Sequence, residues 1–262
     1  MSWFCAPRAV FGRHSAEVRD GDLAQAAVSR SQGAGHDGSG HRAARGAFPP
    51  VTANRDLVVG DDGNARCRWG ASDERYRDYH DREWGRPVTD ERGLYEKLCL
   101  ECLQSGLSWA LILRKRDGIR DALAEFDPDR VARFGAREFA KLLEDERVIR
   151  NRRKLEAIVQ NARATVAMRA GTPLPDLVWS FADARPRPAP RSYADLPPQT
   201  VTSKRLAKEL KQQGFAFVGP TTVYATMQAV GVVNDHLAGC FVRDDVEAAQ
   251  KAARSSFFAA DR

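Results

Sequence analysis

The sequence lacks a continuous apolar run of about 18 residues, so it predicts no segment that crosses a membrane. Residues 1–6 lack the basic and then apolar stretches of a secretory signal, which favours a cytoplasmic location. Only five of the 262 residues are cysteines, and this odd number suits free thiols or metal ligands better than a disulfide framework. These absences argue against a membrane protein and against a small secreted domain.

A sustained strand pattern is missing too, because residues 215–218 come nearest to alternation and are too few to define a strand. From about residue 65, apolar side chains recur every three or four positions, as at Leu155, Ile158, Val159 and Ala162. The sequence therefore predicts an all-α fold without internal repeats, in a domain over residues 63–244. Residues 1–62, rich in Gly, Ser and His at 32–41, predict a disordered leader, and residues 245–262 a polar C-terminal tail.

Acidic residues are outnumbered, with 35 Asp and Glu against 41 Lys and Arg, which gives a formal net charge of +6. Such a balance favours a polyanionic partner such as nucleic acid, although many basic proteins bind none. Residues 147–154 form one basic run between two helical segments, which suits phosphate binding by a hairpin; the alternative is a solvated turn. A second group lies on the predicted amphipathic helix 201–214, with the basic residues Lys204, Arg205, Lys208 and Lys211.

Two histidines and two cysteines form a candidate metal site. His236 and Cys240 are four positions apart, which places them on one face of a helical turn. Together with Cys67 and His80 they would make the closed Cys2His2 set of a structural zinc site. The pairs are far apart in the sequence, so such a site would join the two ends of the domain rather than fold a zinc finger. Spacing alone also allows buried thiols and hydrogen-bonded histidines.

A carboxylate, Glu101, stands in a helical segment that is otherwise apolar, residues 98–103. A buried charge is costly unless it is paired, protonated or solvated in a cavity, so this residue marks a candidate functional site. The alternative is an ion pair with one of the many arginines. Around this segment lies an unusual density of aromatic residues, which would stack on an extruded base or simply fill a helical core: Trp69, Tyr76, Tyr79, Trp84 and Trp109.

Taken together, these motifs resemble the 3-methyladenine DNA glycosylase I (Tag) family over residues 65–242. The motifs that carry the resemblance are Arg66-Cys67, Trp69-Gly70, Tyr79-His80-Asp81, Glu83-Trp84-Gly85, Leu100-Glu101, residues 105–109, 178–181 and 214–219, Met227-Gln228-Ala229 and Asn234-Asp235-His236.

The resemblance implies a helix-hairpin-helix DNA glycosylase fold in which a structural zinc joins the N- and C-terminal parts. The implied zinc ligands are Cys67, His80, His236 and Cys240. The implied pocket carboxylate is Glu101, as the catalytic residue that engages the base edge without activating water, and the base-binding aromatics are Tyr76, Tyr79 and Trp109, with Trp69 and Trp84 nearby. The implied hairpin, residues 148–153, would contact the DNA backbone through Arg150, Arg152, Arg153 and Lys154.

The implied activity is hydrolysis of the N-glycosidic bond of 3-methyladenine in double-stranded DNA after base flipping, which leaves an abasic site. The implied enzyme is monofunctional, since no lysine nucleophile stands in the pocket motifs. The resemblance also implies a monomer. Two alternatives stay open: a zinc-stabilised DNA- or RNA-binding protein without enzymatic activity, and a helical zinc protein unrelated to nucleic acid. A magnesium-dependent nuclease is disfavoured because the sequence has no suitable cluster of carboxylates.

Overall fold

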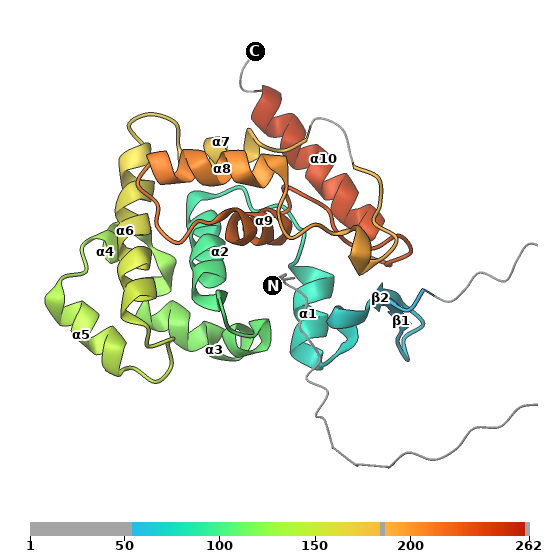
Figure 1. The fold of residues 1–262 in the computed structure, drawn as a ribbon, viewed down its shortest axis with the longest axis horizontal. Helices are drawn as coiled ribbons and strands as arrows, with labels where there is room; N and C mark the ends of the chain where they lie inside the picture. Colours follow the sequence, from blue (N-terminus) through green and yellow to red (C-terminus); the bar gives the residue numbers. More distant parts are fainter. Residues whose placement is uncertain (1–53, 184–186, 260–262) are drawn as a thin grey trace, which may run out of the picture. The chain divides into compact units, whose positions relative to one another are not determined.

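The structure is a computed structural model that describes residues 54–183 and 187–259 (Figure 1). The prediction of a disordered leader falls mostly on residues 1–53, which lie outside the described residues. The described part is mostly helical, and none of its helices is long and apolar enough to cross a membrane. In chain order the elements are β1 Leu57–Val59, β2 Ala65–Cys67, η1 Arg68–Ala71, α1 Glu74–Arg82, α2 Glu91–Gln104, α3 Trp109–Ala122, η2 Ala124–Phe126, α4 Pro128–Ala132, α5 Ala136–Glu144, α6 Arg152–Met168, α7 Leu174–Trp179, η3 Tyr193–Asp195, α8 Val201–Gln212, α9 Pro220–Ala229 and α10 Arg243–Ala259.

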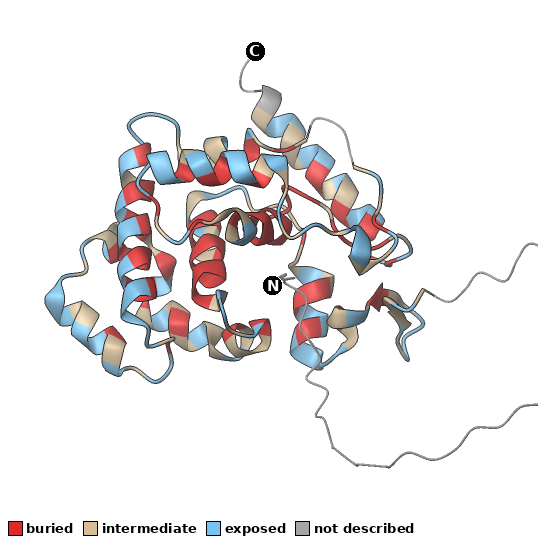
Figure 2. Ribbon diagram, viewed as in Figure 1, coloured by how far each residue is buried: buried red, intermediate tan, exposed pale blue. Residues whose placement is uncertain are grey.

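Helix α2 lies at the centre of the core, where it packs against α3, α6 and α9. Nine of its fourteen residues are buried, and residues 97–103 are buried without interruption, so the second half of the helix is surrounded on all sides. Figure 2 shows this burial along α2 and α9, in contrast to the half-exposed outer helices. Asp90 caps the start of α2 by accepting a hydrogen bond from the amide of Gly93 at 2.8 Å. Glu101 is one of the buried residues of α2, so it lies in the interior of the domain.

Helices α5 and α6 and the turn between them form the predicted helix-hairpin-helix unit. Val148 anchors the turn because its side chain is buried in the core. Asn151 caps α6 by accepting a hydrogen bond from the amide of Lys154 at 3.2 Å. The buried Val148 and the cap of α6 therefore fix both ends of the turn.

Two elements of the structure lie wholly or partly outside residues 63–244, the predicted domain. Residues 57–59, assigned to the leader, form β1, which pairs antiparallel with β2, and the two strands were too short for any alternation to reveal them. Residues 245–259, assigned to a polar tail, belong to α10. That helix is tied to the core, since Phe257 stacks on Trp179 with a centroid separation of 5.4 Å and Gln250 donates to the carbonyl of Gly85 at 3.0 Å.

Candidate metal centre and base-binding site

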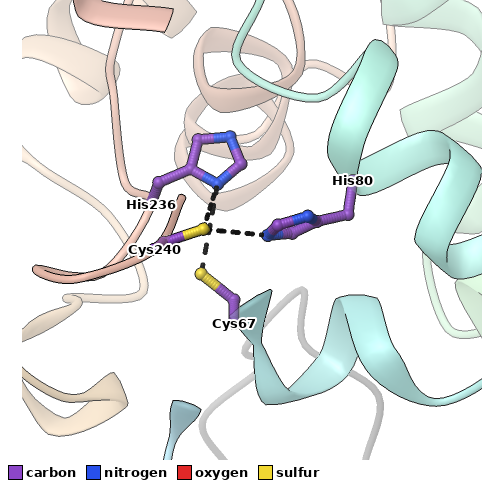
Figure 3. Close-up of side chains that lie close together, drawn as sticks. All are labelled: Cys67, His80, His236 and Cys240. Atoms are coloured by element: carbon purple, nitrogen blue, oxygen red, sulfur yellow. Dashed lines mark hydrogen bonds between the residues drawn. The ribbon is translucent and has the colours of Figure 1, made fainter. Parts of the chain in front are cut away.

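The four predicted ligands converge from both ends of the domain (Figure 3). Cys67 ends β2, His80 lies on α1, and His236 and Cys240 lie on the loop between α9 and α10. Their ligand atoms are buried and all lie within 4.8 Å of one another. The loop is fastened to β2 by backbone contacts, because the amide of Phe241 donates to the carbonyl of Ala65 at 2.8 Å.

The spacing of these atoms fits a tetrahedral metal ion. Metal bonds of about 2.3 Å to sulfur and about 2.0 Å to nitrogen place neighbouring ligand atoms roughly 3.3–3.8 Å apart. The Sγ atom of Cys240 lies 3.5 Å from Nε2 of His80 and 3.6 Å from Nδ1 of His236. Sγ of Cys67 lies 4.0 Å from the same Nδ1. The buried Cys2His2 group is therefore suited to a metal ion.

The outward nitrogen of each histidine is held by a second contact. Nδ1 of His80 lies 2.7 Å from a carboxylate oxygen of Asp81, which in turn accepts hydrogen bonds from Arg66 at 2.9 and 3.1 Å. Nε2 of His236 lies 3.1 Å from the carbonyl oxygen of Trp84. Such contacts fix which ring nitrogen keeps its proton, so that the other nitrogen is free to bind a metal.

The electrostatics of the cluster favour the metal-binding form of Cys240 and of His236, but not that of Cys67. A hydrogen bond from Cys67 lowers the pKa of the Cys240 thiol, aided by the rings of His236 and His80, whereas the same contact with Cys240 and burial raise the pKa of Cys67. Burial lowers the pKa of His236, which keeps the imidazole neutral. A thiolate and a neutral imidazole are the forms that bind metal ions.

Gly70 allows the ring of His80 to sit where it does, because a Cβ atom at residue 70 would lie 2.4 Å from Cγ of that ring. Gly70→Ala is therefore expected to displace His80 and to lower the metal bound per chain at least twofold, as measured by elemental analysis of purified protein. Gly171→Ala is the matched control, since no atom lies within 4 Å of its added Cβ. Equal metal content in both variants would contradict the tight fit.

Three of the predicted base-binding aromatics are buried beside one another, and Trp69 links them. Tyr79 and Trp109 have ring centroids 5.2 Å apart, and Trp69 lies 6.0 Å from Tyr76 and 6.3 Å from Tyr79. Ser108 caps α3 and so sets Trp109 at the first position of that helix. The indole nitrogen of Trp109 is buried and has no hydrogen-bond partner among the described residues. A buried donor without a partner is costly and is explained well by a ligand that supplies an acceptor.

Glu101 is only 4% exposed and lies on the face of α2 that is turned toward α1. The direction follows from Lys97, one helical turn earlier, whose ammonium lies 5.1 Å from the centroid of the Tyr79 ring. Burial opposes ionisation of Glu83, but Lys97 and Arg116 outweigh it and lower the pKa of this carboxyl. Lys97 thus forms an ion pair with Glu83.

Trp69 and Trp84 connect the two sites. Trp69 lies 5.1 Å from the ring of His80, and Trp84 lies 4.6 Å from the ring of His236. The two indoles contact each other edge to face, with centroids 5.0 Å apart. The metal ligands therefore support the walls of the aromatic cluster through these two side chains.

The predicted backbone-binding residues divide into two groups. Arg150, Arg152 and Arg153 are exposed at the hairpin. Lys154 is buried instead, and its ammonium donates to the carbonyls of Leu103 at 2.8 Å and Ser105 at 2.5 Å. The prediction that Lys154 contacts DNA is corrected accordingly: the helical phase of α6 turns it inward, where it binds the C-terminal carbonyls of α2.

Lys154→Met should leave these buried carbonyls without their donor, at a cost of about 1–3 kcal/mol in the free energy of unfolding. Urea denaturation checks this value. Arg153→Met, one position away on the exposed face, should change the free energy by less than about 0.5 kcal/mol. A variant at residue 154 as stable as the wild type would contradict the buried role.

Asp235 and Asp81 were missed as contributors to the site. The carboxylate of Asp235 accepts hydrogen bonds from Tyr224 at 2.6 Å, Gln228 at 2.7 Å and Arg187 at 2.9 Å, and so fixes the loop that carries His236. Both aspartates adjoin a metal-binding histidine in the sequence, a position that suggests such support. Tyr224 and Gln228 also line a pocket of about 330 Å³, together with Ser105 and Gly106.

The fold and the site define a helical DNA glycosylase with a metal-binding group that ties its two ends together. The family model of the methyladenine glycosylases matches residues 69–243. The chain therefore belongs to the methyladenine glycosylase family, as the resemblance predicted.

Relatives of known name agree with this assignment. The chain is 45% identical over 178 residues to the DNA-3-methyladenine glycosylase of Haemophilus influenzae, covering 67% of this chain and 96% of that protein. It is 44% identical over 177 residues to DNA-3-methyladenine glycosylase 1 of Escherichia coli, covering 67% and 95%. A crystal structure of a 3-methyladenine DNA glycosylase I superposes with a TM-score of 0.65 at 46% identity, covering 67% of this chain and 98% of that one. The Staphylococcus aureus enzyme, solved to explain 3-methyladenine recognition, gives 0.64 at 33% identity, covering 68% and 96%.

Proposed function

We infer that this protein is a DNA-3-methyladenine glycosylase that removes the methylated base from DNA in base-excision repair. The observation that carries the assignment is the buried pair of a carboxylate and an aromatic wall: Glu101 faces α1, where Tyr79 packs on Trp109. Relatives with 44–45% identity bear the name of this activity. Hydrolysis adds water at the sugar C1′ and releases the base, so an abasic site remains.

The chemistry of the substrate suits this pocket. Methylation at N3 gives adenine a positive charge, and that charge is neutralised when the glycosidic bond breaks. Tyr76, Tyr79 and Trp109 stack on or border the extruded ring and attract its charge, while Trp69 and Trp84 hold them in place. Glu101 accepts a hydrogen bond from the edge of the base, and the indole N–H of Trp109 donates to an acceptor on it.

The metal is zinc in this proposal, and its role is structural. Two thiolates and two imidazoles are the donor set that zinc prefers, and four protein ligands leave no open position for water or substrate. When bound, the ion supplies cross-links between β2, α1 and the loop before α10. The rings of His80 and His236 in turn pack against Trp69 and Trp84, which border the base.

The DNA is double-stranded, and the exposed hairpin residues Arg150, Arg152 and Arg153 bind its phosphates. Two of them form ion pairs with a glutamate four residues away, and both pairs are long: 3.9 Å for Arg150 with Glu146 and 3.8 Å for Arg152 with Glu156. Such exposed pairs are worth little and are readily exchanged for phosphate. We place the protein in the cytoplasm as a monomer.

The test is incubation with methylated duplex DNA and chromatography of the released bases. The proposal expects 3-methyladenine in the soluble fraction and alkali-labile abasic sites in the DNA. A zinc-stabilised DNA- or RNA-binding protein would instead show salt-sensitive binding without base release. That result would reject the enzymatic assignment.

A further inference from the structure

Three lysines form a charged stripe on the outer face of α8. Lys204, Lys208 and Lys211 stand at intervals of four and three residues, which places them on one side of the helix. All three are exposed, and none forms an ion pair with any described residue. The hairpin arginines Arg150 and Arg152, in contrast, each have a glutamate within 4 Å. The lysine stripe is therefore a cationic surface without a neutralising carboxylate among the described residues.

The stripe borders a hollow of about 360 Å³ that is also lined by Ala207, Gln212 and Pro220. On the opposite face of α8, Leu206 and Leu210 are buried, and the helix packs along α9 (Figure 1). This packing fixes the direction in which the lysines point. The three lysines therefore lie on a packed helix and not on a loop.

The start of α9 connects the stripe to a pocket beside the end of α2, the helix that carries Glu101. Pro220 borders the hollow and begins α9, and the next two residues, Thr221 and Thr222, line the pocket of about 330 Å³. Ser105 and Gly106 line the same pocket from the other side, directly after the helix that carries Glu101.

The hairpin meets the same turn from its own side. Lys154, near the start of α6, binds the carbonyl of Ser105. The Ser105-Gly106 turn therefore contacts the hairpin helix and also lines the pocket next to the lysine stripe.

We propose that Lys204, Lys208 and Lys211 bind backbone phosphates of the substrate DNA as a second anchoring surface, separate from the hairpin. This inference rests on the proposed function, because it assigns the same DNA to the stripe. The three lysines span roughly 10 Å along α8, at 1.5 Å per residue. Duplex DNA presents about six phosphate charges over that length, enough to engage every lysine. Two anchors on either side of the turn would hold the duplex while one base is extruded.

The experiment compares the triple variant Lys204→Gln, Lys208→Gln, Lys211→Gln with wild type in binding to an undamaged duplex at several salt concentrations. Each phosphate contact contributes about 0.9 to the slope of log affinity against log salt. The slope should fall by about two to three. Base release from methylated DNA at limiting enzyme should fall together with the affinity, because the lysines bind the substrate.

The matched control, Arg130→Gln, Arg133→Gln, Lys251→Gln, removes the same charge from α4 and α10, and its slope should stay near wild type. A triple Lys→Arg variant of the stripe should keep the wild-type slope as well. An unchanged slope in the Lys→Gln variant, or equal losses in both Gln variants, would overturn the second anchor. Absence of base release by wild type would reject the proposed function. The salt dependence of DNA binding would still test the second anchor.

Discussion

Replacing Glu101 with glutamine should lower the release of 3-methyladenine by about 10- to 100-fold. The substitution keeps the size of the side chain and removes its charge, so it loses a charge-assisted hydrogen bond of about 1.5–3 kcal/mol. The measurement is the rate of base release from methylated duplex DNA with enzyme in excess. Binding to undamaged DNA should be unchanged, because Glu101 is buried in the domain and does not reach the DNA backbone.

Glu96→Gln is the control for this variant. Glu96 lies on the same helix, where burial raises its pKa despite the partner Arg120 at 3.6 Å. Its loss should change base release by no more than about twofold. Release by the Glu101 variant at the wild-type rate would remove this residue from the proposed site.

Replacing Cys240 with serine should abolish metal binding and destabilise the whole domain. The cluster joins β2, α1 and the loop before α10, and structural zinc supplies about 10–16 kcal/mol in small zinc-dependent domains. Even a loss of about 5 kcal/mol would lower Tm by roughly 10–20 °C in a domain of this size. Elemental analysis should find about one zinc per chain in wild type and almost none in the variant, and calorimetry gives Tm.

Cys102→Ser is the control for the metal prediction. Cys102 is buried as fully as Cys240 but does not belong to the metal-binding cluster, and burial raises the pKa of its thiol to about 12. Its substitution should leave the metal content at the wild-type value, whatever it costs in stability. Retention of zinc by the Cys240 variant would refute the four-ligand centre.

Much of this site could be predicted because its chemistry leaves few alternatives. His236 and Cys240 are close in the sequence and so were predicted together, although they lie on a loop and not on the predicted helical turn. Glu101 stands out because charged residues are rarely buried. The motifs that resemble the glycosylase family then placed Cys67 and His80 with them. The structure brings all four ligands together and buries Glu101, as predicted.

Other features depend on tertiary contacts that periodicity does not encode. Lys154 sits in a basic run, and only the packing of α6 on α2 decides that it points inward. Strand β1 is three residues long, and α10 is stabilised by Phe257 against a residue far away in the sequence, Trp179. Short strands and a polar helix with few buried apolar residues leave too little pattern to recognise.

The central claim is that Glu101 and the aromatic side chains around it form the binding site for the methylated base. Titration of the protein with free 3-methyladenine, followed by tryptophan fluorescence, tests it most directly, since Trp109 and Trp69 border the site. The account predicts saturable quenching by 3-methyladenine, much weaker quenching by adenine, and loss of the difference in Glu101→Gln. Equal responses to both bases in the wild type would contradict it.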